Sequence, residues 1–366
     1  MNRVTCTPAQ AAEILARIIS LPGDVLPDGR VRYLVPLLEG PPGVGKTEIC
    51  RQAASHQRVG FIHSLVSEWR GLAGGVPNFF DVASDDGHNG HNGLRYVAAG
   101  RIADALHATD PTLLLLDEAF SGTDEDTKTM RAWVHDREVN GLRLPDCVRV
   151  VAATNSRSHG AGLVTMDTAA LSRFGPILHL TAHLPSWTAW ATQSGIAPEI
   201  VAYLHVYPDA LHEFSPNKEI ENYPCPRTWE RVSDAMRAMA GAPSELEMMV
   251  YTGIVGPSRG TEFTEFLRLM RTGCDIEQVL RDPQNAGIPS TASGRWGIAV
   301  MLVHKMNLQH VGAAVTYCQR MYADDAGSFA AYALHEIMRK IPASTSTADW
   351  QRMWATPLGS MIRGIA

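Results

Sequence analysis

Short runs of apolar residues recur along the first half of the chain, and stretches with helical spacing lie between them. A run of this length fits a strand that is buried on both faces of a sheet. The four runs are Leu34–Leu38, Leu113–Leu116, Val148–Ala153 and Ile177–Leu180. Because short strands that alternate with helices form mainly parallel sheets, the pattern predicts an α/β fold with a parallel sheet.

Sequence signals for helices occur before, between and after these runs. In Thr7-Pro8-Ala9-Gln10, Thr7 is a predicted N-cap, and Gln10 can close a capping box. A second helix is predicted from Thr47 to Ala54. After residue 182 the pattern becomes helical and stays so to the end of the chain.

Two segments between the runs have turn-forming sequences. Val139-Asn140-Gly141-Leu142 places Asn-Gly between apolar residues, which predicts a β-hairpin with a type I′ turn just before the third strand. Gly71–Gly93 is rich in Gly, Asn, Asp and His, so we interpret it as a long loop or insertion.

Composition limits the class of protein. The chain has 366 residues, of which 45% are apolar and 19% charged, as in an ordinary globular protein of two or three domains. Its net charge of −6 gives no global positive field for a polyanion, so nucleic acid is not the expected partner. The six cysteines form no C-x-x-C pair, and no run is long enough for a membrane span. The N-terminus lacks a secretory core, so we expect a cytoplasmic protein with reduced thiols.

The first run leads into Gly40-Pro41-Pro42-Gly43-Val44-Gly45-Lys46-Thr47, which matches the phosphate-binding pattern G-x-x-x-x-G-K-[ST]. Glycines let backbone N–H groups turn inward around phosphates, and the following helix directs its positive end at them. Lys46 would reach the β- and γ-phosphates of ATP, and the Thr47 hydroxyl would bind Mg²⁺. A glycine-rich turn without a ligand is the alternative. The residues expected to hold ATP are Gly40, Pro42, Gly43, Val44, Gly45, Lys46, Thr47 and Glu48.

Carboxylates end the second run, where Leu113–Leu116 is followed by Asp117 and Glu118. Asp117 would hold Mg²⁺, and Glu118 would polarise the attacking water as general base. A strand that ends in Asp-Glu is often only a solvated strand end, but a phosphate loop about 70 residues upstream favours the catalytic interpretation. Asn155 ends the third run, where it could orient the water or simply open a turn.

Two arginines complete the candidate site. Arg173 follows a predicted helix end, and in a ring it could reach the γ-phosphate of a neighbouring subunit; the alternative is a surface arginine in an ordinary ion pair. Arg227 lies where Pro226 starts a helix, so a mobile lid could bring it over the nucleotide, although a capped helix start explains the same residues.

These motifs stand in one order: GPPGVGKT, LLLLDEAF, VAATN, LSRFG and PRTWE. The order resembles Walker A, Walker B, sensor 1, arginine finger and sensor 2 of AAA+ ATPases, with details of the MoxR family. Other stretches resemble a bacterial MoxR-like subgroup whose genes often neighbour a von Willebrand factor A-like protein. They are Arg70–Leu72, Asp136–Val139, Leu144–Asp146 and Gly253–Gly256 through Glu262–Phe263. Ser121–Thr123 and the His- and Asn-rich insertion depart from the family pattern.

The resemblance implies an AAA+ P-loop NTPase core, an α-helical lid and a helical C-terminal extension. The corresponding ranges are 1–181, 182–275 and 276–366. It assigns Lys46 and Thr47 to Walker A, Asp117 and Glu118 to Walker B, Asn155 to sensor 1, Arg173 to the finger and Arg227 to sensor 2.

By this resemblance the chain would be a Mg²⁺-dependent ATPase, in a homo-oligomeric, hexameric ring. It would remodel, mature or activate a client protein, with a von Willebrand factor A-like protein as a candidate. A nucleic-acid-directed motor is the alternative, opposed by the net charge. An ATP-gated assembly scaffold is another, and the presence of both Glu118 and Arg173 favours a working hydrolase over it.

Overall fold

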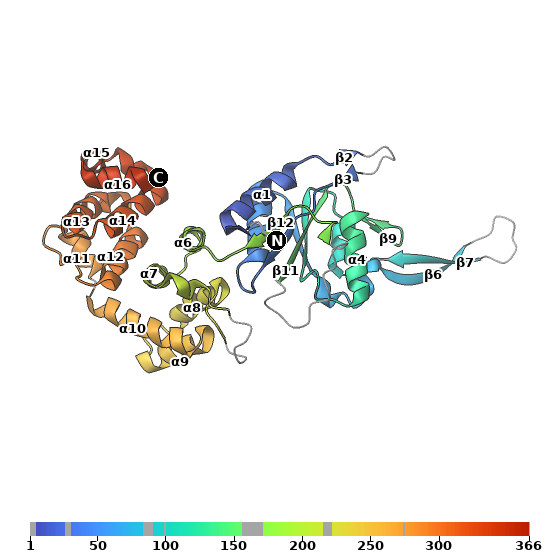
Figure 1. Ribbon diagram of the computed structural model, residues 1–366, viewed down its shortest axis with the longest axis horizontal. Coiled ribbons are helices and arrows are strands. Elements are labelled where there is room, and N and C mark those ends of the chain that lie inside the picture. Colours follow the sequence, from blue (N-terminus) through green and yellow to red (C-terminus); the bar gives the residue numbers. More distant parts are fainter. Residues whose placement is uncertain are drawn as a thin grey trace. The chain divides into compact units, whose positions relative to one another are not determined.

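The computed structural model describes residues 5–25, 31–82, 91–98, 100–155, 171–214, 222–273 and 275–365. They form two compact units (Figure 1). The α/β unit runs to His183 and includes Phe214, and the helical unit begins at Leu184. No helix in these ranges combines the length and the apolar character needed to cross a membrane.

The α/β unit is built on a six-stranded sheet in the order β1-β12-β4-β11-β8-β5, and all neighbouring pairs are parallel. Its strands are β1 (Thr5–Cys6), β4 (Leu37–Gly40), β5 (Gly60–Leu65), β8 (Thr112–Asp117), β11 (Val148–Asn155) and β12 (Ile177–Leu180). The predicted class is confirmed: the first unit is an α/β core with a parallel sheet, and a helical C-terminal region follows it.

Strand predictions fared well, with two exceptions. The first predicted strand starts three residues later than expected, because Pro36 has no N–H for the ladder and Leu34 is 54% exposed. The two edge strands, β1 and β5, were not predicted. The other three predicted strands are confirmed within two residues at each end.

Helices cover both faces of the sheet, because alternate residues of the central strands point to opposite sides. One face packs on α1 (Pro8–Ser20) and α2 (Lys46–Gln57) through residues such as Leu38, Leu115 and Ala153. The other packs on α3 (Gly100–Leu106) and α4 (Asp124–His135) through residues such as Leu37, Leu116 and Ala152.

Local sequence signals set several boundaries of this unit. Thr7 caps α1, and both halves of the predicted capping box with Gln10 are present. The predicted hairpin is also confirmed, with β9 (Glu138–Val139) antiparallel to β10 (Leu142–Arg143). Asn140 (φ 51°) and Gly141 (φ 79°) both have the positive φ that a type I′ turn requires.

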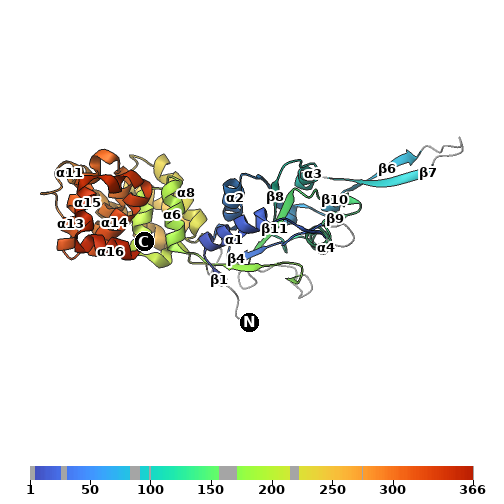
Figure 2. The ribbon, with the colours of Figure 1, turned by 90° about the horizontal axis from the view of Figure 1, so that it is seen from above.

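The segment 71–93 is not the long loop that its composition favoured. Its first part forms a short 3₁₀ helix, η2 (Leu72–Gly74), and then strand β6 (Val76–Val82), which pairs antiparallel with β7 (His91–Val97). Figures 1 and 2 show this hairpin extending outward from the α/β unit. The prediction failed because the Gly, Asn, Asp and His content of the whole segment hid the strand-forming Val and Phe residues of β6, which pair with β7 at seven positions.

The smaller elements of the α/β unit are β2 (Asp24–Val25) antiparallel to β3 (Val31–Arg32), and the 3₁₀ helix η1 (Val66–Glu68). Among the described residues, Cys6, Cys50, Cys147, Cys225 and Cys318 are free thiols. For Cys50 on α2, burial raises the pKa of the thiol and the nearby Asp117 carboxylate adds to the effect, so this thiol is unsuited to act as a nucleophile.

The helical unit contains the following elements: α6 (Leu184–Gln193), α7 (Pro198–Val206), η4 (Pro208–Leu211), α8 (Pro226–Ala238), α9 (Ser244–Val255), α10 (Pro257–Gly273), α11 (Ile276–Arg281), α12 (Ala292–Lys305), η5 (Leu308–His310), α13 (Val311–Ala323), α14 (Gly327–Lys340), η6 (Pro342–Ser346), α15 (Ala348–Trp354) and α16 (Pro357–Ile365). Helix α7 packs along α12, so the helices after residue 275 adjoin those before it. The finer division at residues 275 and 276 stays a prediction.

A buried histidine lies where α7 meets the later helices. The His205 ring stacks on Trp296 of α12, with centroids 4.3 Å apart, and lies 4.7 Å from the ring of Tyr332 on α14. Burial lowers the pKa of His205 to about 4. The imidazole therefore remains neutral at pH 7 within an aromatic cluster.

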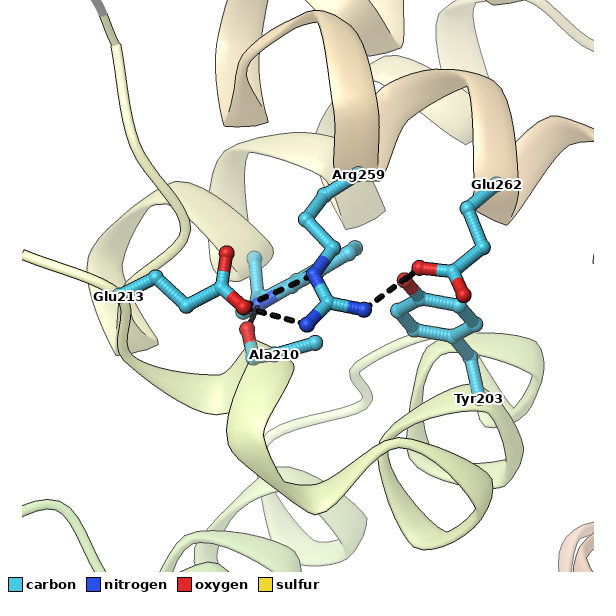
Figure 3. A network of polar contacts seen from close by, with 6 residues as sticks. Tyr203, Ala210, Glu213, Arg259 and Glu262 are labelled. Atoms are coloured by element: carbon cyan, nitrogen blue, oxygen red, sulfur yellow. Dashed lines mark hydrogen bonds and ion pairs between the residues drawn. The ribbon is translucent and has the colours of Figure 1, made fainter.

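A polar network joins three segments of the helical unit (Figure 3). Arg259 of α10 donates to Glu213, which follows η4, and to Glu262 one turn along its own helix at 2.6 Å. Tyr203 of α7 donates to the same Glu262 carboxylate at 2.7 Å. These four residues are called the Arg259 network below. The hydrogen bond to Glu213 raises the pKa of Arg259, so the network keeps its positive charge.

Candidate functional site

Strand ends bring the predicted site residues to one edge of the sheet. The carboxyl ends of β4 and β11 are in register, with Gly40 paired to Asn155, and β8 ends at Asp117 beside them. Ligands of open parallel sheets bind outside this edge. Gly40, Asp117 and Asn155, which are far apart in the sequence, therefore lie close together at this edge, as their motifs predicted.

The loop between β4 and α2 needs glycine at two positions. Gly43 (φ 78°) and Gly45 (φ 101°) adopt a left-handed backbone that other residues rarely tolerate. Gly45 is the N-cap of α2, and no side chain caps that helix end. The first-turn N–H groups of α2, including that of Glu48, thus have no partner within the helix and carry its positive dipole end.

The ammonium group of Lys46 lies inside the loop. Nζ donates to the carbonyl oxygens of Gly40 and Pro41, both at 3.0 Å, and to Oδ1 of Asn155 at 2.9 Å. The residue is only 8% exposed. A phosphate would be a stronger partner for this charge than these carbonyl and amide oxygens.

A hydroxyl and a carboxylate form the second part of the site. Thr47 Oγ1 donates to Oδ2 of Asp117 at 2.7 Å, and Asp117 is 9% exposed. Both are hard oxygen donors of the kind that Mg²⁺ prefers, and Mg²⁺ sites usually take only one or two protein ligands beside waters and phosphates. The donors present therefore fit Mg²⁺. Lys46, Thr47, Asp117, Glu118 and Asn155 are called the P-loop cluster below.

Glu118 has an unusual backbone. Its φ is 52°, in the left-handed region, and its N–H donates to Oδ1 of Asp117 at 2.9 Å. The carboxylate accepts a hydrogen bond from Ser67 Oγ at 2.7 Å. Backbone strain of this kind concentrates at functional sites, where the surrounding structure must hold it.

Two polar residues of the site were not predicted from the sequence. His63 on β5 places Nε2 3.0 Å from Oδ2 of Asp117, and Ser67 follows in η1. The available signal was a polar residue inside the apolar stretch Gly60–Leu65, but this stretch was not predicted as a strand. Its pairing with β8 is what brings His63 to Asp117.

Three further predicted residues are Glu48, Arg173 and Arg227. The Glu48 side chain contacts Gln52 and Arg51 on the surface of α2, which leaves only its backbone to face the loop. Arg173 is exposed, in the turn between Leu171 and β12. Arg227 belongs to the helical unit and is exposed in the first turn of α8, whose N-cap is Cys225.

No model of a known protein family matches the sequence, and no curated protein matches it. Among solved structures, the chain is similar to a RuvB P216G mutant of Thermotoga maritima, with 16% identity over 83% of this chain and 84% of that one, at a TM-score of 0.36. It is also similar to the FIGL-1 AAA domain in complex with ADP, with 20% identity over 74% and 84% of the two chains, at a TM-score of 0.39.

Proposed function

We propose that this chain is an ATP-hydrolysing, MoxR-type AAA+ ATPase whose ring remodels, matures or activates a partner protein. The observation that carries the proposal is the P-loop cluster. A buried lysine, a hydroxyl–carboxylate pair and a second carboxylate meet beside an uncapped helix start. Each group has a separate task in phosphoryl transfer to water.

The loop between β4 and α2, together with Lys46, would bind the phosphates. The first-turn N–H groups of α2 would donate to the phosphate oxygens, and the helix dipole would favour their negative charge. Lys46 would exchange its bonds with Gly40 and Pro41 for bonds to the β- and γ-phosphates. This exchange lets the apo protein keep the ammonium in place before the substrate arrives.

Thr47 and Asp117 would hold Mg²⁺, Thr47 directly and Asp117 through its water shell. When bound, the ion supplies positive charge that offsets the charge developing on the phosphates. The 2.7 Å bond between the two side chains fixes them toward each other without any ion. The protein's part is therefore to present two preoriented oxygen ligands.

Glu118 would act on water. Its carboxylate would take a proton as the water oxygen bonds to the γ-phosphorus and the bond to the ADP oxygen breaks, which yields ADP and phosphate. Asn155, held by Lys46 at 2.9 Å, would orient that water with its amide. A general base of this kind contributes about 10²–10⁴-fold to the rate.

Substitution of Glu118 tests this proposal. Glu118→Gln keeps the size of the side chain but removes the base, so ATP turnover should fall by about 10²-fold or more. Binding of a fluorescent ATP analogue should persist in the same variant. Glu125→Gln on α4 is the matched control and should retain turnover. Near-normal turnover in Glu118→Gln would remove Glu118 from the base role.

We also propose that Arg173 completes the site of a neighbouring subunit in a hexameric ring. A guanidinium that stabilises transition-state charge in this way contributes about 10³–10⁵ to the rate. Arg173→Ala and Lys46→Ala should each be inactive alone. When mixed they should recover activity, because some interfaces then combine an intact loop with an intact arginine. No recovery in well-mixed rings would exclude action between subunits.

For the client, the resemblance to MoxR-like proteins points to a protein complex in the cytoplasm, with a von Willebrand factor A-like protein as the first candidate. Glu118→Gln should accumulate the ATP-bound ring with its client. A pull-down with this variant in the presence of ATP tests the assignment, and Lys46→Ala is the control that should retain no client. Equal recovery by both variants would show that capture does not depend on ATP.

A further inference from the structure

His63 occupies a place in the site that the five P-loop cluster residues do not explain. It lies on edge strand β5, in register with Leu115 of β8, while Leu65 pairs with Asp117. Alternate residues of a strand share a face, so Phe61 and His63 point to the same side. Phe61 packs on the core beneath α2, and this puts His63 on the α2 side, next to Thr47.

The imidazole lies nearly parallel to a neighbouring aromatic ring. The ring centroids of His63 and Phe61 are 6.4 Å apart and their planes differ by 20°. Arg51 of α2 lies over the Phe61 ring, 5.0 Å from its centre. The His63 side chain is 32% exposed, so it borders both the core and the open side of the site.

Hydrogen bonds fix both oxygens of the Asp117 carboxylate. Oδ1 accepts from the Glu118 N–H at 2.9 Å. Oδ2 accepts from Thr47 Oγ1 at 2.7 Å and lies 3.0 Å from His63 Nε2. A carboxylate only accepts hydrogen bonds, so Nε2 must be the donor. Without His63, Oδ2 would be held by Thr47 alone, whose hydroxyl must also serve the metal.

We propose that His63 is a positioning residue for the Mg²⁺ site. Its Nε2–H directs Oδ2 of Asp117 toward Thr47 and so preorients the two oxygen ligands. This inference rests on the proposed ATPase function, and it specifies which residue outside the familiar motifs tunes the metal site. Loss of such an outer partner usually weakens metal binding or activity by about 10–100-fold.

The test measures nucleotide binding, with hydrolysis blocked by Glu118→Gln in every sample. A fluorescent ATP analogue is titrated in EDTA and then at a series of Mg²⁺ concentrations. With His63→Phe, which keeps a ring but has no donor, affinity in EDTA should equal that of the parent. The Mg²⁺ concentration for half-maximal enhancement should rise about 10-fold or more. His63→Gln, which can still donate, should recover most of this loss.

An exposed histidine on the last turn of α2 provides the control, because His56→Phe should leave both affinities unchanged. If His63→Phe does not fold, His63→Ala carries the same expectation. An unchanged Mg²⁺ dependence, with binding in the parent intact, overturns the role of His63 alone. A parent that binds no nucleotide overturns the proposed function and the role of His63 with it.

Discussion

The P-loop cluster and the Arg259 network are both partly buried polar groups, yet they are bonded differently. Arg259 donates to two carboxylates, and Tyr203 donates to one of the same two. Lys46 donates to two carbonyls of its own loop and to the side-chain amide of Asn155. The hydrogen bonds of the Arg259 network thus join carboxylates of different segments, whereas those of Lys46 go to backbone carbonyls and an amide at the strand ends.

This difference predicts which of the two clusters contributes to stability and which to function. Charge-assisted hydrogen bonds between segments hold helices in place, because removal of one member leaves charged groups without partners. Hydrogen bonds from an ammonium to carbonyl oxygens contribute little net stability, and a phosphate is a stronger partner for the same charge. We therefore expect substitutions in the Arg259 network to act mainly on stability, and substitutions in the P-loop cluster to act mainly on the proposed ATP chemistry.

Lys46→Ala should give the largest effect. Loss of this charge removes the main side-chain donor to the phosphates, and ATP turnover should fall by at least about 10²-fold. The free energy of unfolding should change by about 1 kcal/mol, because hydrogen bonds such as those to Gly40, Pro41 and Asn155 contribute little net stability. Turnover assays and urea unfolding on the same samples measure both quantities. A large loss of stability with near-normal ATP turnover would show that Lys46 serves the fold rather than the proposed chemistry.

Arg259→Ala tests the role of the Arg259 network in stability. It leaves Glu213 and Glu262, each about one-third exposed, without their cation, so the helical unit should lose about 2 kcal/mol of stability. Faster hydrogen exchange in α7 and α10 would localise the effect. Arg237→Ala on α8 removes an exposed ion pair and is the control, with an expected change within about 0.5 kcal/mol. Equal effects of the two substitutions would mean that the network is not structural.

Local chemistry explains which features the sequence predicted. The capping box at Thr7, the turn at Asn140-Gly141 and the loop that ends at Gly45 each depend on backbone conformations set by a few adjacent residues. Asp117 and Asn155 could be placed because the carboxyl ends of parallel strands share one edge. The main components of the candidate site therefore followed from motif and strand order.

Contacts between distant segments explain what was missed. His63 meets Asp117 only because β5 joins the sheet beside β8, and Arg259 meets Glu213 across 46 positions. The β6–β7 hairpin is held by seven cross-strand pairs, which the composition of the segment does not reveal. In each case the decisive partner lies outside the local window, where neither composition nor periodicity could identify it.

His205 extends the comparison to a buried group that is kept neutral. Its pKa is lowered to about 4 in the folded helical unit, from about 6.5 in an unfolded chain. Between these two pKa values the unfolded state therefore binds more protons than the folded state. The contribution of His205 should lower the free energy of unfolding by about 2 kcal/mol from pH 7 to pH 5. His205→Phe should remove that part of the pH dependence in urea unfolding. His56→Phe on the surface should not.

Ser67→Ala should have the smallest effect. It tests whether a change beside the P-loop cluster can alter ATP turnover and leave the free energy of unfolding unchanged. Ser67 Oγ occupies one acceptor site of the proposed base Glu118, at 2.7 Å, which a water would otherwise reach. Without it, ATP turnover should rise about two- to fivefold, under about 1 kcal/mol in the barrier. Ser67→Thr keeps the hydroxyl and should match the parent. Because Ser67 is exposed, the unfolding midpoint should stay unchanged, and a coupled loss of stability would show that Glu118 depends on this bond for its strained backbone.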